Sequence, residues 1–237
     1  MAARSDILLE PCRFPGPRPM QNFDDLAFRQ SLAGLADGLA SRITPSGEVP
    51  FVFAIDGPGC CGKSTLTELL LERLDAVSIG TDDFPEHAGF HREPNAPLPY
   101  RRWTDLRNAV GDLARGVATT IRSIEWSDHS LGAPVAIEPR PVLIVDGIGS
   151  MHADVSRHAD LKVWVDGHAG NRMRRIAHRE GRDMAEEWAP YVRLEQAYLA
   201  IWRPWRQADV FVLGAELDWG NLGECFSHLI DSGRPAA

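Results

Sequence analysis

The sequence lacks several features that would each indicate a particular class of protein. No run of about 18 or more apolar residues is present, as a membrane-spanning helix requires. The N-terminus has no basic stretch followed by an apolar one, so a secretory signal is not indicated. Only four cysteines occur, without the spacing of a metal site or the density of a disulfide scaffold. We therefore expect a cytoplasmic protein with reduced thiols and no membrane partner.

Positive charge is also scarce. The chain of 237 residues has 25 Lys and Arg against 33 Asp and Glu, which gives a formal net charge of −8. This balance argues against a surface that follows a nucleic-acid backbone, so no nucleic-acid partner is expected. The length and a hydrophobic fraction of 44% suit one sizeable core. They leave the oligomeric state open, a homo-oligomer included.

Short apolar runs that are typical of strands buried on both faces recur along the chain. Five of them are separated by helical or mixed segments, an order that predicts a doubly wound α/β domain with a parallel sheet. The runs cover residues 49–55, 76–79, 142–145, 161–165 and 210–213.

The remaining segments predict helices, a hairpin and loops around this sheet. We expect an N-terminal arm and helix over residues 1–44 and one main domain over 45–237, with an insertion at about 84–138. The insertion holds a loop, a helix over 103–115, and a hairpin with strands at 120–126 and 134–138. A last helix, 185–207, carries an aromatic stripe at the spacing that core packing requires. The stripe consists of Trp188, Tyr191, Leu194, Tyr198, Trp202 and Trp205.

Residues 57–64 match the phosphate-loop pattern G-x-x-x-x-G-K-[ST], between an apolar strand and a helix. Glycines let backbone N–H groups approach phosphate oxygens, and the helix N-terminus adds its positive end. The Lys63 ammonium suits the β- and γ-phosphates, and the Ser64 hydroxyl can ligate Mg²⁺. We therefore expect ATP and Mg²⁺ as cofactors. The expected nucleotide-binding residues are Gly57, Gly59, Cys60, Cys61, Gly62, Lys63, Ser64 and Thr65.

Cys60 and Cys61 are unusual residues for such a loop. Lys63 and the helix N-terminus could lower the pKa of a thiol there, so that oxidation or alkylation would block nucleotide binding. The alternative is that two small residues merely fit the loop.

Acidic residues follow two of the expected strands. In an open α/β sheet ligands lie beyond the carboxyl ends of the strands, so these residues are candidates for the site. Asp146 follows the run 142–145 and suits the metal. Asp82 and Asp83 follow the run 76–79, and either could accept the proton of an attacking hydroxyl.

Together these motifs resemble the uridine kinase branch of the P-loop kinases, which also contains pantothenate kinase and phosphoribulokinase. The resemblance implies a three-layer sandwich with a five-stranded parallel sheet, an inserted substrate hairpin and an Arg-rich lid at about 170–184. Asp82-Asp83-Phe84 is similar to the segment that holds the catalytic base. It implies that Asp82 is the base and that Asp82, Asp83 and Phe84 bind the substrate.

The resemblance also assigns roles in the hairpin and the lid. Trp126 and His129 would bind the base of a nucleoside. Arg172 would bind the nucleotide, Arg175 would act in catalysis, and Arg182 would do so and contact the substrate. A planar guanidinium suits the charge that spreads over the transferred phosphoryl group.

The expected function is Mg²⁺-dependent transfer of the γ-phosphate of ATP to a hydroxyl, in the first place the 5′-hydroxyl of a nucleoside or nucleoside-like compound. Ile124 and Leu131 stand where the family has polar contacts, so a sugar, a vitamin precursor or an antibiotic is an alternative acceptor. A second alternative is a nucleotide-hydrolysing switch protein. The hairpin argues against it, and an N-K-x-D motif is absent.

Overall fold

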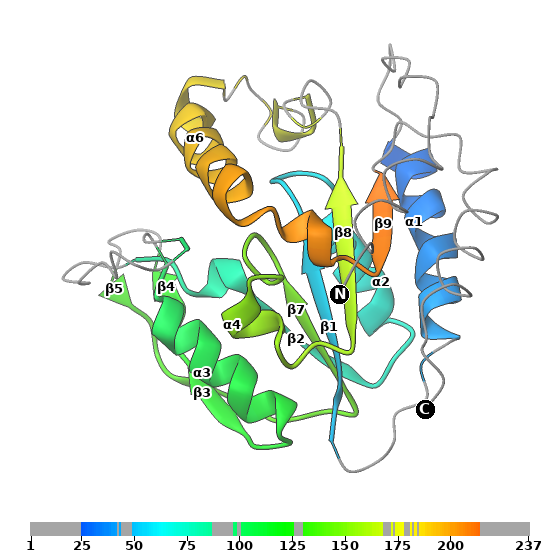
Figure 1. The fold of residues 1–237 in the computed structure, drawn as a ribbon, viewed down its shortest axis with the longest axis vertical. Coiled ribbons are helices and arrows are strands. Elements are labelled where there is room, and N and C mark those ends of the chain that lie inside the picture. The colour runs from blue at the N-terminus through cyan, green and yellow to red at the C-terminus, as the bar shows by residue number, and fades with distance from the viewer. Residues whose placement is uncertain are drawn as a thin grey trace, which may run out of the picture.

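The fold is built on one parallel sheet (Figure 1). The computed structural model describes residues 25–41, 43, 49–86, 97–98, 101–125, 130–167, 172, 174–177, 181, 183 and 185–213. The sheet has five strands in the order β2-β7-β1-β8-β9, and every neighbouring pair is parallel. All five expected strands and the α/β fold class are thus confirmed. The strands are β1 Phe51–Asp56, β2 Ala76–Gly80, β7 Val142–Asp146, β8 Leu161–Asp166 and β9 Val210–Leu213.

Helices cover both faces of the sheet and make three layers. On one face lie α1 (Asp25–Ala40) and α2 (Lys63–Leu71), and on the other lie α3 (Trp103–Ala114), α4 (Ala153–Ser156) and part of α6 (Ala185–Trp202). Successive side chains of β1 alternate between the faces, as a doubly covered strand requires. Phe53 and Ile55 pack with α1 and α2, while Val52 packs with α3.

The N-terminal helix shares the core of the sheet. Leu32, Ala36 and Leu39 of α1 are buried in the same cluster as Leu66 and Leu70 of α2. Their spacing places them on one stripe of α1, which explains why this helix lies flat against the layer. The boundaries given above for the arm, the insertion and the lid stay predictions.

The expected hairpin is present, but as two short ladders. β3 (Thr119–Ile121) pairs with β6 (Val135–Ile137), and β4 (Ile124–Glu125) pairs with β5 (Ser130–Leu131), both antiparallel. Between the ladders the returning strand has one residue more than its partner, which interrupts the pairing as a bulge does.

The last helix differs from its prediction in length and burial. It ends at Trp202 instead of residue 207, because Arg203 takes a left-handed conformation (φ 47°) and Pro204 cannot continue an α-helix. Tyr198 is buried, but Tyr191 and Trp202 are 62% and 44% exposed, so the expected burial of the whole aromatic stripe is wrong. No helix in the described ranges has both the length and the apolar character to cross a membrane.

Candidate active site

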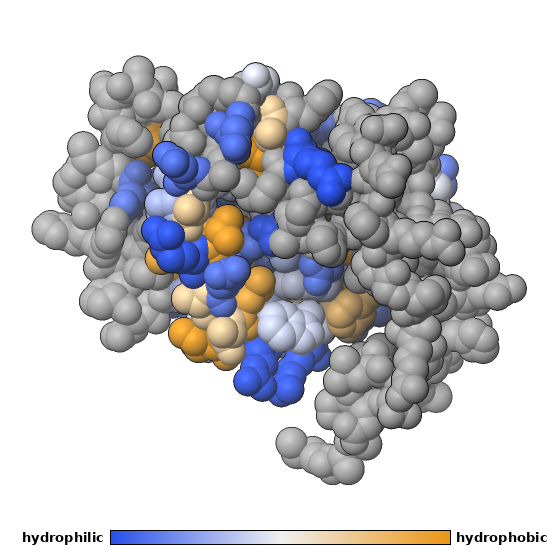
Figure 2. Space-filling view, turned by 90° about the horizontal axis from the view of Figure 1, so that it is seen from above, coloured by the Kyte–Doolittle hydropathy of each residue, from blue (hydrophilic) through white to orange (hydrophobic). Residues whose placement is uncertain are grey.

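Three candidate segments meet at one edge of the sheet. β7 lies between β1 and β2, and Asp146 pairs in register with Ile55 on one side and Gly80 on the other. The phosphate loop that follows β1 and the acidic pair that follows β2 therefore flank Asp146. Figure 2, which looks down on this edge, shows hydrophilic and hydrophobic side chains next to each other.

The phosphate loop needs glycine where its backbone turns. Gly57 has φ 149°, and a Cβ there would overlap the carbonyl oxygen of Val165 on β8. Gly62 has φ 101° and immediately precedes α2. Lys63 begins that helix and is buried, and its Nζ donates to the carbonyl oxygen of Pro58 at 2.8 Å. The loop thus places an ammonium group and a helix N-terminus together, which suits a polyphosphate.

Asp56 anchors the loop and was missed in the sequence. This fully buried carboxylate accepts hydrogen bonds from the backbone N–H groups of Gly57 at 2.7 Å and Met151 at 3.0 Å, and from the Tyr198 hydroxyl at 3.3 Å. Burial raises the pKa of Asp56 to about 6, although these N–H groups and Lys63 act in the opposite direction. The sequence signal that could have indicated Asp56 is an acidic residue at the end of an apolar strand, directly before the loop.

Asp146 fits the metal role that its position predicted. Burial raises its pKa, and Lys63 and the hydroxyls of Ser64 and Thr67 lower it. Its Oδ1 is buried with no hydrogen-bond partner among the described residues, which leaves an oxygen suited to a hard cation. No group of three or more His, Cys, Asp or Glu in the described ranges could hold a metal. Ser64 and Asp146 would therefore hold Mg²⁺ together with phosphate and water oxygens.

The two aspartates after β2 have different environments. The Asp83 carboxylate accepts a hydrogen bond from the N–H of Gly80 at 2.8 Å, and burial raises its pKa. The Asp82 side chain is 80% exposed and pairs with Arg101. An exposed carboxylate at the end of β2 can meet a hydroxyl from solvent, whereas the Asp83 carboxylate is already engaged by the Gly80 N–H. The geometry therefore favours Asp82 as the base.

Arg101 and Arg102 form a second part of the site that the sequence interpretation did not include. Arg101 donates to the carbonyl oxygen of Thr81 at 2.9 Å in addition to pairing with Asp82. Arg102 is buried beneath the Phe84 ring and donates to Asp105 at 2.9 Å. Both therefore hold the segment that presents Asp82.

A cavity of about 250 Å³ opens beside this segment. Phe84, expected to bind the substrate, contributes to its wall, and so does Leu131 of the hairpin. Its walls mix apolar, hydroxyl and charged groups, which suits a small polar molecule. The lining includes Phe84, Arg102, Asp105, Thr120, Ile121 and Leu131.

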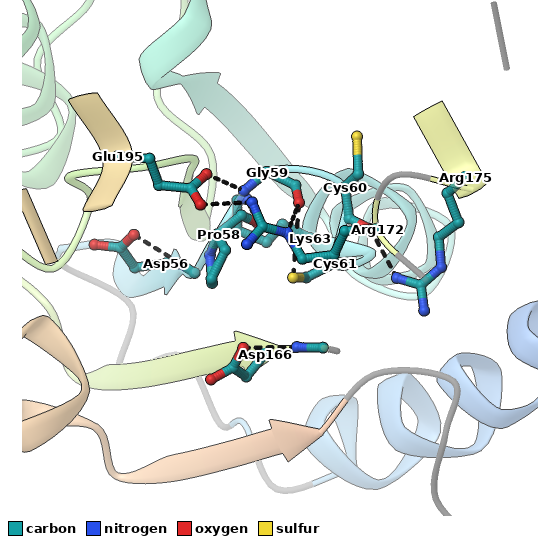
Figure 3. A network of polar contacts seen from close by, with 12 residues as sticks. Asp56, Pro58, Gly59, Cys60, Cys61, Lys63, Asp166, Arg172, Arg175 and Glu195 are labelled. Carbon is teal, nitrogen blue, oxygen red and sulfur yellow. Dashed lines mark hydrogen bonds and ion pairs between the residues drawn. The ribbon is translucent and has the colours of Figure 1, made fainter. Parts of the chain in front are cut away.

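Two of the three lid arginines contact the phosphate loop (Figure 3). Arg172 Nε donates to the carbonyl oxygen of Gly59 at 2.6 Å, and Arg175 Nη1 donates to that of Cys60 at 2.7 Å. Both side chains therefore lie at the phosphate loop, and their roles toward the nucleotide stay predictions. Arg182, Trp126 and His129 lie outside the described residues.

The hypothesis of a thiol with lowered pKa is wrong for Cys61. Its side chain is fully buried, and burial raises its pKa to about 12 despite nearby Lys63 and Arg172. Its place is in the core cluster with Leu66 and Val165, so it acts as a small apolar residue. Cys60 is partly exposed and adopts a left-handed conformation with φ 59°.

Known proteins with similar sequences are kinases. A uridine kinase from Chloroflexus aggregans is 28% identical over 169 residues, which are 65% of this chain and 78% of that protein. A pantothenate kinase from Leifsonia xyli subsp. xyli is 32% identical over 151 residues, 54% of this chain and 46% of that protein. No protein-family model matches the sequence.

A solved structure supports the same fold. It is described as a possible uridine kinase from Bacillus stearothermophilus, and it aligns with a TM-score of 0.52 at 19% identity. The alignment covers 78% of this chain and 98% of the other.

The fold and the phosphate loop define the class of protein: it has a P-loop kinase fold and is a phosphotransferase that acts on an alcohol group. Within that class, the curated relatives confirm the resemblance to the uridine kinase-like branch. The enzyme class and the fold predicted from the motifs are therefore both confirmed.

Proposed function

We propose that this protein is an ATP- and Mg²⁺-dependent kinase that phosphorylates a hydroxyl of a small molecule, in the first place the 5′-hydroxyl of a nucleoside or nucleoside-like compound. One observation carries the proposal. The phosphate loop, a buried Asp146 oxygen with no hydrogen-bond partner in the described part of the chain, and the exposed carboxylate of Asp82 lie at the ends of three adjacent strands. The names of the curated uridine kinase relatives support the acceptor.

The residues divide the reaction between them. Asp82 takes the proton of the acceptor hydroxyl while the oxygen of that hydroxyl attacks the γ-phosphorus. The bond between the γ-phosphorus and the β–γ bridging oxygen breaks, and ADP leaves. Lys63 and the loop N–H groups other than that of Gly59, which donates to Glu195, would hold the phosphates. The resemblance assigns Arg175 and Arg182 to the transferred group. Mg²⁺, held by Ser64 and Asp146, would neutralise phosphate charge when bound. Trp126 and His129 would bind the acceptor.

A different small acceptor is the second candidate. Leu131 lines the cavity, and Ile124 is buried in the hairpin where the family has polar contacts. Because an apolar wall discriminates weakly among polar acceptors, a sugar or a vitamin precursor such as pantothenate could replace the nucleoside. A pantothenate kinase among the relatives supports testing it.

A panel of acceptors decides between these candidates. ADP formation is measured with Mg²⁺ and ATP plus uridine, cytidine, pantothenate or hexoses, against a sample without acceptor. We expect a nucleoside to raise the rate at least about tenfold over that background. Stimulation by another compound alone would favour the second candidate, and unstimulated hydrolysis would favour a switch protein. The cytoplasmic location and the absence of membrane and nucleic-acid partners stay predictions.

A further inference from the structure

A closed ring of polar contacts links α6 to the phosphate loop and the lid (Figure 3). The N–H of Gly59 donates to Oε2 of Glu195 at 2.6 Å, and the Gly59 carbonyl oxygen accepts from Nε of Arg172 at 2.6 Å. Arg172 Nη2 then donates to Oε1 of Glu195 at 2.5 Å. Both backbone polar groups of one loop residue are therefore held by a single ion pair.

This ion pair is buried, unlike those on the surface. The side chains of Glu195 and Arg172 are 5% and 14% exposed, whereas those of the Asp112–Arg115 pair are 38% and 60% exposed. An exposed pair is screened by water and constrains its partners weakly. A buried pair that also satisfies two backbone groups restricts its partners to one arrangement.

The helix that carries Glu195 is fixed to the loop at a second point. Tyr198 lies three residues further along α6 and therefore on the same face. Its hydroxyl donates to Asp56, which itself accepts from the N–H of Gly57. The contact between Tyr198 and Asp56 therefore fixes α6 against the start of the loop, and Glu195 reaches Gly59 from that fixed helix.

The ring leaves part of the Arg172 guanidinium unused. Nε and Nη2 are engaged, while Nη1 contacts no acceptor in the part of the chain that the structure describes. A guanidinium held through two of its nitrogens has a defined orientation before any ligand arrives. The third nitrogen can then donate to a phosphate oxygen without first ordering the side chain.

From this geometry we propose that Glu195 is a positioning residue for nucleotide binding, which acts by holding Arg172 in place at the phosphate loop. The inference rests on the proposed function, since it assigns Arg172 to the triphosphate. Its carboxylate does not oppose the triphosphate strongly, because Arg172 and the Gly59 N–H already compensate its charge.

Four variants test this role: Glu195→Gln, Arg172→Gln, the double variant, and Glu186→Gln as a control on an exposed part of α6. Binding of ATP with Mg²⁺ is measured by calorimetry, and the melting temperature by circular dichroism. We expect Glu195→Gln and Arg172→Gln each to weaken binding about tenfold, the size of a lost charge-assisted hydrogen bond. The double variant should bind no more weakly than Arg172→Gln alone, and the control should bind as the wild type does.

The two measurements separate positioning from stability. A single variant leaves one buried charge unpaired and should melt earlier, while the double variant should recover much of that loss without regaining ATP affinity. Unchanged or tighter ATP binding by Glu195→Gln, or additive losses in the double variant, would overturn the proposal. If the wild type binds no ATP, the proposed function itself fails. If the wild type binds ATP and Glu195→Gln binds it with the same affinity, only the role of Glu195 fails.

Discussion

The phosphate loop and the acceptor side of the site differ in what holds their polar groups in place. The loop is fixed by its backbone, by a buried strand on one side and a helix on the other, and by the buried carboxylate of Asp56. On the acceptor side, which comprises Asp82 and the cavity beside Phe84, the exposed Asp82 carboxylate pairs with the side chain of Arg101. Part of the cavity wall comes from a hairpin of two short ladders. The turn of the loop is therefore a property of one contiguous motif, although Arg172 and Glu195 also hold it from distant segments. Asp82 has no such motif around it and is held by one side chain 19 positions away.

Replacement of Lys63 by Met should have the largest effect. It removes the buried ammonium of the phosphate loop, and we expect kcat/KM to fall by about a thousandfold. Steady-state kinetics with varied ATP measures the loss. A variant with more than a tenth of the normal kcat/KM would show that the loop is not the centre of the reaction.

The pH dependence of stability should expose Asp56. Burial raises its pKa in the folded state from 3.8 to about 6, so the folded protein holds this proton more tightly than the unfolded chain. The stabilisation is complete below about pH 4 and is lost as the pH rises through about 6, on the order of 3 kcal/mol in total. Asp56→Asn should abolish that contribution, measured as urea unfolding free energies of both proteins across this range.

Tyr198→Phe is the matched control for Asp56. It removes one hydrogen bond to the carboxylate but leaves the titrating group in place. Its stability should therefore vary with pH as in the wild type. Equal pH profiles for the wild type and Asp56→Asn would contradict the assignment.

Asp82 and Asp83, the two aspartates after β2, should respond differently to the same replacement. Asp82→Asn should lower kcat by about a hundredfold while ATP still binds, because only the base is lost. Asp83→Asn should instead reduce stability by about 1 kcal/mol, since it weakens the bond to the Gly80 N–H. Rates and melting curves on both variants check this division. Similar kinetic losses in the two variants would remove the distinction.

The smallest expected effect concerns Cys61. Because the thiol is buried with a pKa of about 12, alkylating reagents at neutral pH should leave it unmodified in the folded protein. Mass spectrometry of peptides after brief treatment measures this, with denatured protein as the control. Cys61→Ala should keep ATP binding within about twofold of the wild type. Rapid modification of Cys61 in the native state would contradict its place in the core.

Much of the fold was predictable because the strands are continuous apolar runs and the loop is a contiguous motif. The residue types alone could not distinguish Asp82 from Asp83 as the catalytic base, since both follow the same strand. The structural difference between them is that Asp83 accepts a hydrogen bond from the Gly80 N–H, whereas the Asp82 side chain is exposed. The burial of the aromatic stripe was predicted wrongly because part of that helix faces the phosphate loop and solvent instead of the core.

Glu195 and Arg101 could not be found by pattern alone. Glu195 contacts a residue 136 positions away, and Arg101 pairs with one 19 positions away across a long loop. The local signal for Glu195 was an acid three residues before Tyr198, on the face of the predicted helix that carries the aromatic stripe. It becomes meaningful only once the fold brings α6 to the loop.

We propose that the site transfers phosphate instead of merely binding it. Incubation with ATP labelled at the γ-phosphate, Mg²⁺ and a mixture of nucleosides, followed by chromatography, tests it directly. We expect label in a nucleoside monophosphate for the wild type and almost none for Asp82→Asn. Label found only in inorganic phosphate, with nucleosides, pantothenate and sugars all supplied, would contradict it.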